Sequence, residues 1–179
     1  MLSHTKKQKI SLYKDNMKFS AAHFTIFSAT QRERLHGHNF NVRVDFDVVV
    51  HEDGMISDYA FYKRMIEKMC RQWNEYTLMP KNSKYLKIEK KEIDDNDLYQ
   101  ITFNKQSMYL PVDEVLILDC ENITVEELSR IMAENLVEKL LNKNQQNTAS
   151  DKSVKKEVTS FEVSVYSGPG QCGTTFLQL

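Results

Sequence analysis

The strongest constraint on this chain is an unbroken alternation of apolar and polar residues over positions 40–48. Its apolar members are Phe40, Val42, Val44, Phe46 and Val48, and the residues between them are Asn41, Arg43, Asp45 and Asp47. Because successive side chains of a strand point to opposite faces, this pattern predicts a strand with one buried face and one wet face. Such strands are typical of antiparallel sheets that are covered on one side only. We therefore expect an antiparallel sheet at this point of the chain.

Two further stretches predict helices. Asp58 can cap a helix after Gly54, and Thr124 with Glu127 forms a capping box ahead of another. Apolar residues then recur every three or four positions, as Tyr62, Met65, Ile66, Met69, Cys70 and Trp73 in the first helix and as Leu128, Met132, Leu136 and Leu140 in the second. We expect the second helix to end in a mobile polar linker over residues 142–157, which contain almost nothing to bury.

Shorter alternating segments predict the remaining strands. Residues 10–19 are expected to pair with 40–48 through a long loop, and residues 112–118 form another short strand. Alternation on both sides of a turn at 167–170 predicts a final hairpin. Residues 80–111 contain a charged block and predict a surface insertion with room for a small hairpin.

Taken in order, these elements predict one α+β domain over residues 1–179, with five strands and two helices. The 24 Lys and Arg residues against 25 Asp and Glu leave a formal charge of -1, which supplies no field for nucleic acid or an anionic membrane. No apolar run reaches the roughly 18 to 20 residues that span a bilayer. The three separated cysteines suggest free thiols in a reducing compartment. We therefore expect a soluble, cytoplasmic protein with no nucleic-acid or membrane partner.

Three of the five histidines, His23, His36 and His38, lie within sixteen residues. Side chains two apart in a strand face the same way at about 7 Å, so His36 and His38 can converge on one ion while Gly37 leaves space between them. His23 has the parity of Phe19 and would reach the same face from the paired strand. Three neutral imidazoles are typical of a catalytic zinc site whose fourth position is open to water or a substrate oxygen.

Other interpretations of these side chains stay open. Each histidine can instead hydrogen-bond to nearby backbone without any ion. A structural zinc site normally has four protein ligands, and no cysteine or fourth histidine lies nearby, which favours the open site. A carboxylate can still complete the set, because Glu33 is close enough in sequence to serve as a ligand or as a general base. The simplest role of Glu33 is that of a solvated loop carboxylate.

The motifs at residues 19–23 (FSAAH), 35–40 (LHGHNF) and 58–59 (DY) resemble those of the 6-pyruvoyl-tetrahydropterin synthase and 6-carboxytetrahydropterin synthase family. The order of predicted elements is similar to that of the family's tunnelling fold (T-fold), so the resemblance covers nearly the whole chain. It implies an α+β domain with an antiparallel four-stranded sheet and two helices packed on one face. It implies that His23, His36 and His38 bind Zn²⁺. It also implies a pterin substrate, 7,8-dihydroneopterin triphosphate or a close relative, and a homo-oligomer, namely a hexamer of two stacked trimers.

The chain departs from ordinary members of this family just before the second motif. Those members place a catalytic cysteine where this sequence has Arg32 or Thr30. The pattern with Glu33 is instead similar to a glutamate-bearing subgroup from malaria parasites and some bacteria, whose product is 6-hydroxymethyl-7,8-dihydropterin, a folate precursor. A carboxylate can remove a hydroxyl proton while zinc polarises the adjoining oxygens, and retro-aldol cleavage then removes the side chain. The resemblance thus makes Glu33 the catalytic base.

Two more positions differ from the family pattern. The family's Asp-His pair aligns with Asn74 and Glu75, so Glu75 would belong to an altered proton relay. The pterin-anchoring glutamate aligns with Ser167, which can satisfy only part of the ring's N–H edge, and the nearby Glu162 alternates away from the core face. Thr124 matches a pterin-contacting threonine of the family, beside its role as a helix cap.

The resemblance therefore implies a zinc-dependent lyase of pterin biosynthesis that acts on the side chain of 7,8-dihydroneopterin triphosphate. Its product would be 6-hydroxymethyl-7,8-dihydropterin, which feeds folate synthesis, or 6-carboxytetrahydropterin, which feeds queuosine synthesis. The alternative is a diverged family member that binds zinc and a planar heterocycle without lyase activity. The substitutions at Arg32, Asn74, Glu75 and Ser167 motivate that alternative.

Overall fold

The hydrophobic patterns of the sequence become strands and helices in the computed structural model, which describes residues 6–50, 54–56, 59–150 and 158–179. The strands are β1 (Lys6–Leu12), β2 (Lys18–His23), β3 (His36–Val50), β4 (Tyr76–Pro80), β5 (Leu86–Ile93), β6 (Asn96–Phe103), β7 (Gln106–Pro111), β8 (Val115–Leu118), β9 (Val158–Gly168) and β10 (Gln171–Gln178). The helices are α1 (Ala60–Trp73), the short 3₁₀ helix η1 (Val112–Glu114) and α2 (Val125–Ser150). The predicted α+β class is confirmed.

The long strand β3 is the centre of the main sheet. Seven strands take part, in the order β10-β9-β3-β2-β4-β8, and β1 also pairs with β3. The buried face predicted over 40–48 is confirmed, because each of its apolar side chains is at most 3% exposed, whereas Asp45 on the opposite face is also buried. The single strand expected over 10–19 is interrupted by a turn, in which the Met17 N–H donates to the Lys14 carbonyl at 2.8 Å. Two strands, β1 and β2, therefore pair with successive parts of β3.

The predicted four-stranded antiparallel sheet is wrong in strand number and partly in strand direction. β4 runs parallel to β2, and β8 runs parallel to β4. Three consecutive residues of β4, Leu78, Met79 and Pro80, are buried, so this strand lacks the alternation that reveals a strand in a sequence. Parallel neighbours also need a crossover connection, which α1 and the insertion before β8 provide.

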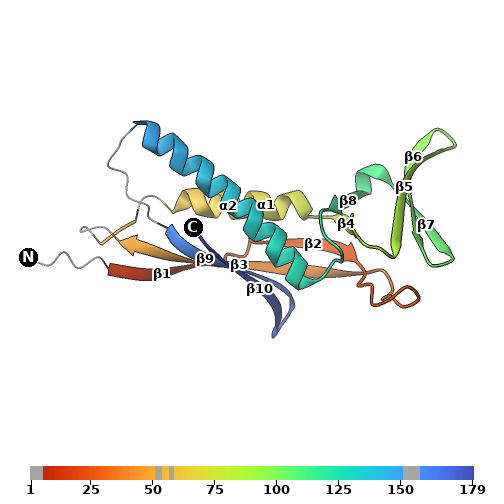
Figure 1. Ribbon diagram of the computed structural model, residues 1–179, viewed down its shortest axis with the longest axis horizontal. Helices are drawn as coiled ribbons and strands as arrows, with labels where there is room; N and C mark the ends of the chain where they lie inside the picture. The colour runs from red at the N-terminus through yellow and green to blue at the C-terminus, as the bar shows by residue number, and fades with distance from the viewer. Residues whose placement is uncertain (1–5, 51–53, 57–58, 151–157) are drawn as a thin grey trace, which may run out of the picture.

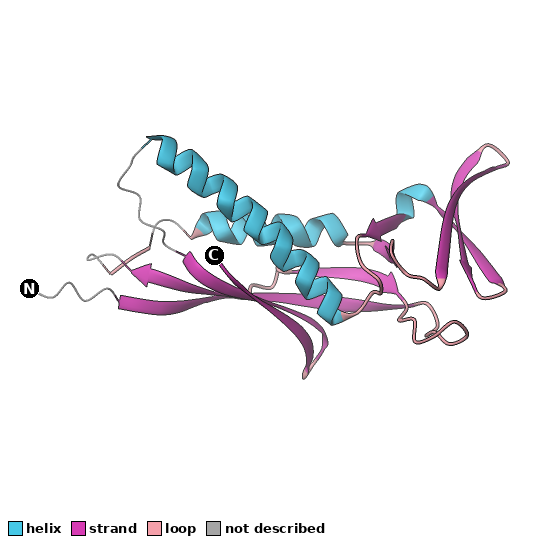
Figure 2. Ribbon diagram, in the orientation of Figure 1, coloured by secondary structure: helices cyan, strands magenta, loops and turns pink. Residues whose placement is uncertain are grey.

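Both long helices lie on one face of the main sheet and cross each other over it (Figure 2). The buried residues of α1 are the six predicted ones, whereas its predicted cap Asp58 lies outside the described residues. α2 continues to Ser150, so the predicted linker is wrong over 142–150, where no glycine or proline interrupts the helix. Residues 151–157 of that linker lie outside the described part. No helix of the described chain is both long and apolar enough to cross a membrane.

The insertion is larger than a small hairpin. β5, β6 and β7 form a separate antiparallel sheet at one end of the molecule (Figure 1). Ile101 and Phe103 from this sheet are at most 5% exposed and share a second hydrophobic cluster with Phe24 and Ile26. Because Phe24 and Ile26 follow directly after β2, the insertion supports the loop that joins β2 to β3.

Candidate metal centre

Two paired strands bring the three histidines together. His23 ends β2 and lies opposite His36 at the start of β3, while Ala21 lies opposite His38. One ligand nitrogen from each of the three rings lies within 4.8 Å of the other two. His23 is buried, and His36 and His38 are half-buried. The structure therefore assembles a cluster that can hold one metal ion at the edge of the core.

Backbone carbonyls orient two of the three rings. His23 Nδ1 lies 3.0 Å from the Ile123 carbonyl oxygen, and His36 Nδ1 lies 2.8 Å from the Arg34 carbonyl oxygen. A carbonyl oxygen only accepts, so each Nδ1 must carry the proton and Nε2 of the neutral ring presents a lone pair. His36 Nε2 lies 2.9 Å from His38 Nε2, which brings the two metal-binding edges together.

The donor set fits a divalent cation. His23 Nε2 is buried and has no hydrogen-bond partner within the described residues. An unsatisfied buried polar atom costs about 1–3 kcal/mol, and a cation shared by the three rings would satisfy it. Imidazole nitrogens suit zinc and several other first-row metals. The carbonyls behind His23 and His36 hold the tautomer that such an ion requires.

The surroundings of His23 also keep its ring neutral. Burial lowers the pKa of His23, and the nearby rings of His36 and His38 lower it further, against the opposing effect of the hydrogen bond to the Ile123 carbonyl. The result is a pKa below the ordinary histidine value. Since only a neutral imidazole binds a metal, His23 is in its binding form near neutral pH.

Glu33 lies in the loop beside this cluster. Its carboxylate accepts a hydrogen bond from the Thr25 N–H at 2.9 Å, and its own N–H donates to the Thr25 carbonyl at the same distance. Burial raises the pKa of Glu33, but the bonds to Thr25 and the rings of His36 and His23 outweigh burial and leave the pKa below its ordinary value. Among the described residues, the group that can share a metal contains no carboxylate. Glu33 therefore suits a base beside the centre better than a fourth ligand.

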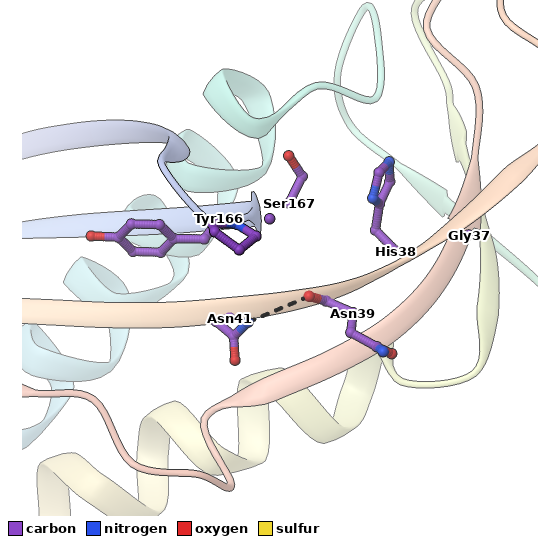
Figure 3. A pocket seen from close by; sticks show the side chains of 8 residues that line it. Gly37, His38, Asn39, Asn41, Tyr166 and Ser167 are labelled. Carbon is purple, nitrogen blue, oxygen red and sulfur yellow. Dashed lines mark hydrogen bonds between the residues drawn. The ribbon is translucent and has the colours of Figure 1, made fainter.

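Two surface hollows adjoin His38. The first, of about 520 Å³, is lined by Gly37, His38, Asn39, Asn41, Tyr166, Ser167, Gly168 and Pro169. Figure 3 shows the side chains of His38 and Ser167 projecting to the same side of this hollow. The second hollow is also lined by His38 and contains Glu75. The structure thus brings Ser167 and Glu75 to hollows that share a histidine of the cluster.

The two other predicted positions have structural partners. Asn74 Oδ1 accepts the Ser20 N–H at 2.9 Å, which ties the end of α1 to β2. Thr124 Oγ1 accepts the Glu127 N–H at 3.4 Å, as expected of a helix cap. Neither side chain lines the two hollows around His38.

One residue of the site was missed in the sequence. Asn122 Oδ1 accepts the N–H groups of Ile26 (3.0 Å) and Ile123 (3.1 Å), and Asn122 Nδ2 donates to the Ile26 carbonyl (2.9 Å). Asn122 therefore joins the loop that carries Glu33 to the carbonyl that orients His23. No local signal reveals this role, because Ile26 and Asn122 lie 96 residues apart.

Known proteins share this sequence pattern and this fold. The family model described as 6-pyruvoyl tetrahydropterin synthase matches residues 12–174. A Methanocaldococcus jannaschii protein provisionally named 6-carboxy-5,6,7,8-tetrahydropterin synthase is 24% identical over 91% of this chain and 93% of its own length. A Pyrococcus horikoshii protein with the same provisional name is 27% identical over 74% of this chain and 75% of its own.

Solved structures agree with the fold. The crystal structure of 6-pyruvoyl tetrahydropterin synthase from Plasmodium vivax has a TM-score of 0.82 and 24% identity, and the match covers 97% of this chain and 99% of the other. Variants of that protein replace a glutamate, described as a catalytic residue, by cysteine or by alanine. Because the family model spans almost the whole sequence, this chain belongs to the 6-pyruvoyl tetrahydropterin synthase family.

Proposed function

We propose that this protein is a zinc-dependent lyase of pterin biosynthesis that acts on the side chain of 7,8-dihydroneopterin triphosphate. The observation that carries the proposal concerns the buried Nε2 of His23, which has no hydrogen-bond partner among the described residues and shares one cluster with the ring nitrogens of His36 and His38. Membership of the family supports the substrate class. The names of the two archaeal relatives point to the same pterin chemistry.

Zinc is the proposed metal because three neutral imidazoles form a common catalytic zinc set. His23, His36 and His38 would hold it. When bound, zinc would polarise the oxygen substituents of the substrate side chain. No fourth protein ligand joins the cluster within the described chain, which favours a catalytic over a structural site.

Glu33 is the proposed base. Its carboxylate is held by the Thr25 N–H and is ionised near neutral pH, so it can take a proton from a substrate hydroxyl. In a retro-aldol cleavage this proton leaves the hydroxyl of the second side-chain carbon, which becomes a carbonyl as its bond to the first carbon breaks. The electron pair passes to the first carbon, in conjugation with the ring imine, and reprotonation there leaves a hydroxymethyl group. The catalytic glutamate of the Plasmodium vivax protein supports this role.

Other side chains around His38 have supporting roles in the proposal. Glu75 lines a hollow with His38 and is the proposed second proton carrier. Ser167 lines the other hollow and would contact the pterin ring as an acceptor for part of its N–H edge. Thr124 is the second proposed ring contact; it lines neither hollow, but it follows Ile123, whose carbonyl orients His23.

The proposal is tested by incubating the zinc-loaded protein with 7,8-dihydroneopterin triphosphate and separating the oxidised, fluorescent pterins. The Glu33→Gln variant should lose turnover by about 10²- to 10⁴-fold, the usual contribution of a general base, while it keeps its zinc. The matched control is Glu89→Gln, which removes an exposed carboxylate paired with Lys87 on β5 and should leave turnover unchanged.

The product decides between two pathways. 6-Hydroxymethyl-7,8-dihydropterin would place the enzyme in folate synthesis, and 6-carboxytetrahydropterin would place it in queuosine synthesis. If the zinc-loaded wild-type protein consumes no substrate, the lyase proposal fails and a diverged heterocycle-binding role takes its place.

We also propose that the chain works as a homo-oligomer, a trimer or a hexamer. The strands β10 and β8 end the described sheet, and such edges are commonly covered by pairing with other copies. Sedimentation measures this directly, and a mass equal to one 21.0 kDa chain would contradict it.

A further inference from the structure

The loop that carries Glu33 is itself a small folded unit. Residues 24–33 double back on themselves, with an antiparallel bridge between Ile26 and Arg32. The Phe27 N–H donates to the Gln31 carbonyl at 2.9 Å, and Thr25 and Glu33 are joined by the two bonds described above. The position of the Glu33 carboxylate therefore depends on what holds this small unit in place.

Arg32 holds the unit from the side of the insertion. Its guanidinium carbon lies 4.5 Å from the ring centre of Phe24 and 5.6 Å from that of Phe103. Its Nη1 donates to the carbonyl oxygen of Glu33 at 2.7 Å. Phe24 is 1% exposed and Phe103 is 5% exposed, so both rings are fixed in the second hydrophobic cluster.

These contacts need the chemistry of arginine. A planar guanidinium can lie over aromatic rings while one of its N–H groups donates sideways to a carbonyl. Lysine offers a point charge without this fixed fork.

We infer that Arg32 is a positioning residue, which holds the Glu33 backbone in place by joining it to the rings of Phe24 and Phe103. Because Phe103 belongs to β6, the β5–β7 sheet then helps to position the proposed base. The inference rests on the proposed function of Glu33 as the base. It assigns a role to Arg32, one of the two positions, with Thr30, at which ordinary family members place their catalytic cysteine. It also explains how an insertion outside the main sheet bears on the chemistry.

Amide hydrogen exchange of the zinc-loaded protein tests the clamp without any substrate. In the Arg32→Met variant, which keeps an apolar stem but loses the charge and the donor, the Thr25 and Glu33 amides should exchange about tenfold faster or more. Arg32→Lys should give an intermediate rate. The control Lys84→Met removes an exposed cation that lies 4.9 Å from the Tyr85 ring and does not touch the loop, so its loop amides should exchange at the wild-type rate.

Turnover of 7,8-dihydroneopterin triphosphate is the second measurement. Arg32→Met should lower kcat by about tenfold or more with KM within about twofold and zinc content unchanged, since a displacement of about 1 Å can cost on the order of 10²-fold in rate. Wild-type exchange rates in Arg32→Met overturn the inference. A large loss of zinc in Arg32→Met also overturns it, because Arg32 would then support the metal cluster rather than Glu33. If Glu33→Gln keeps full turnover, the proposed function fails, and the exchange data still decide whether Arg32 clamps the loop.

Discussion

At the scale of single residues, strand parity predicts which histidines meet, and only the folded chain shows how their rings are oriented. His23, His36 and His38 could be placed on one face because two strands of opposite direction impose that geometry. The carbonyl that fixes the His23 ring belongs to Ile123, 100 residues away, and no local pattern reveals it. Long-range hydrogen bonds of this kind fix the ring orientations that metal binding needs, and the sequence pattern does not predict them.

Asp45 on β3 gives a prediction at this scale. Its carboxylate accepts hydrogen bonds from Arg43 Nε (2.8 Å) and Nη2 (2.9 Å) and from the Ser11 hydroxyl. Burial raises the pKa of Asp45, but these bonds outweigh burial and leave the pKa below its ordinary value. The ionised form therefore stabilises the fold above a pH of about 4, and this stability is lost as the pH falls through the lower folded-state pKa.

Asp45→Asn should lower the free energy of unfolding by about 1–3 kcal/mol at neutral pH, because hydrogen bonds to a charged group are lost. Its difference from the wild type should shrink as the pH falls below about 4. Urea unfolding at a series of pH values measures both effects, with the exposed Asp113→Asn as control. A difference that stays constant with pH would show that the charge of Asp45 contributes nothing.

At the scale of elements, periodic patterns predict the strands and helices whose buried side chains recur at a regular spacing. The buried face of α1 follows from the spacing of its apolar residues, and the final hairpin of β9 and β10 follows from alternation and turn residues. The parallel strand β4 and the full length of α2 do not, because a doubly buried strand does not alternate and a polar sequence without glycine or proline carries no stop signal.

Gly173 on β10 gives a prediction at this scale. A Cβ atom at this position would lie 2.5 Å from the Val125 carbonyl carbon and 2.6 Å from the Glu126 nitrogen, at the start of α2. The contact is with backbone, so no side-chain rotation relieves it, and Gly173→Ala should destabilise the protein by about 1–3 kcal/mol. Thermal and urea unfolding measure this loss. Gly168→Ala in the same hairpin is the control, because no atom of the residues that the structure describes lies within 4 Å of its added Cβ atom, and its effect should stay within about 0.5 kcal/mol.

At the scale of the whole molecule, the site is a meeting point of segments that are distant in the sequence. β2 and β3 supply the histidines, the loop between them supplies Glu33, and the segment before α2 supplies the carbonyl behind His23. The insertion, which the sequence marks only as a charged surface excursion, supports that loop through its apolar face. The class of the fold was predictable because two packed layers follow from the periodicities, whereas the strand count depended on pairings that leave no pattern.

The most direct test of this account is the zinc content of the purified protein, measured by elemental analysis after loading and removal of free metal. We expect about one zinc per chain for the wild type, because three imidazoles form one site. His38→Ala should lose most of the zinc while its circular dichroism spectrum stays that of the folded protein. A wild-type protein that takes up no zinc, or a His38→Ala variant that keeps a full equivalent, would contradict the account.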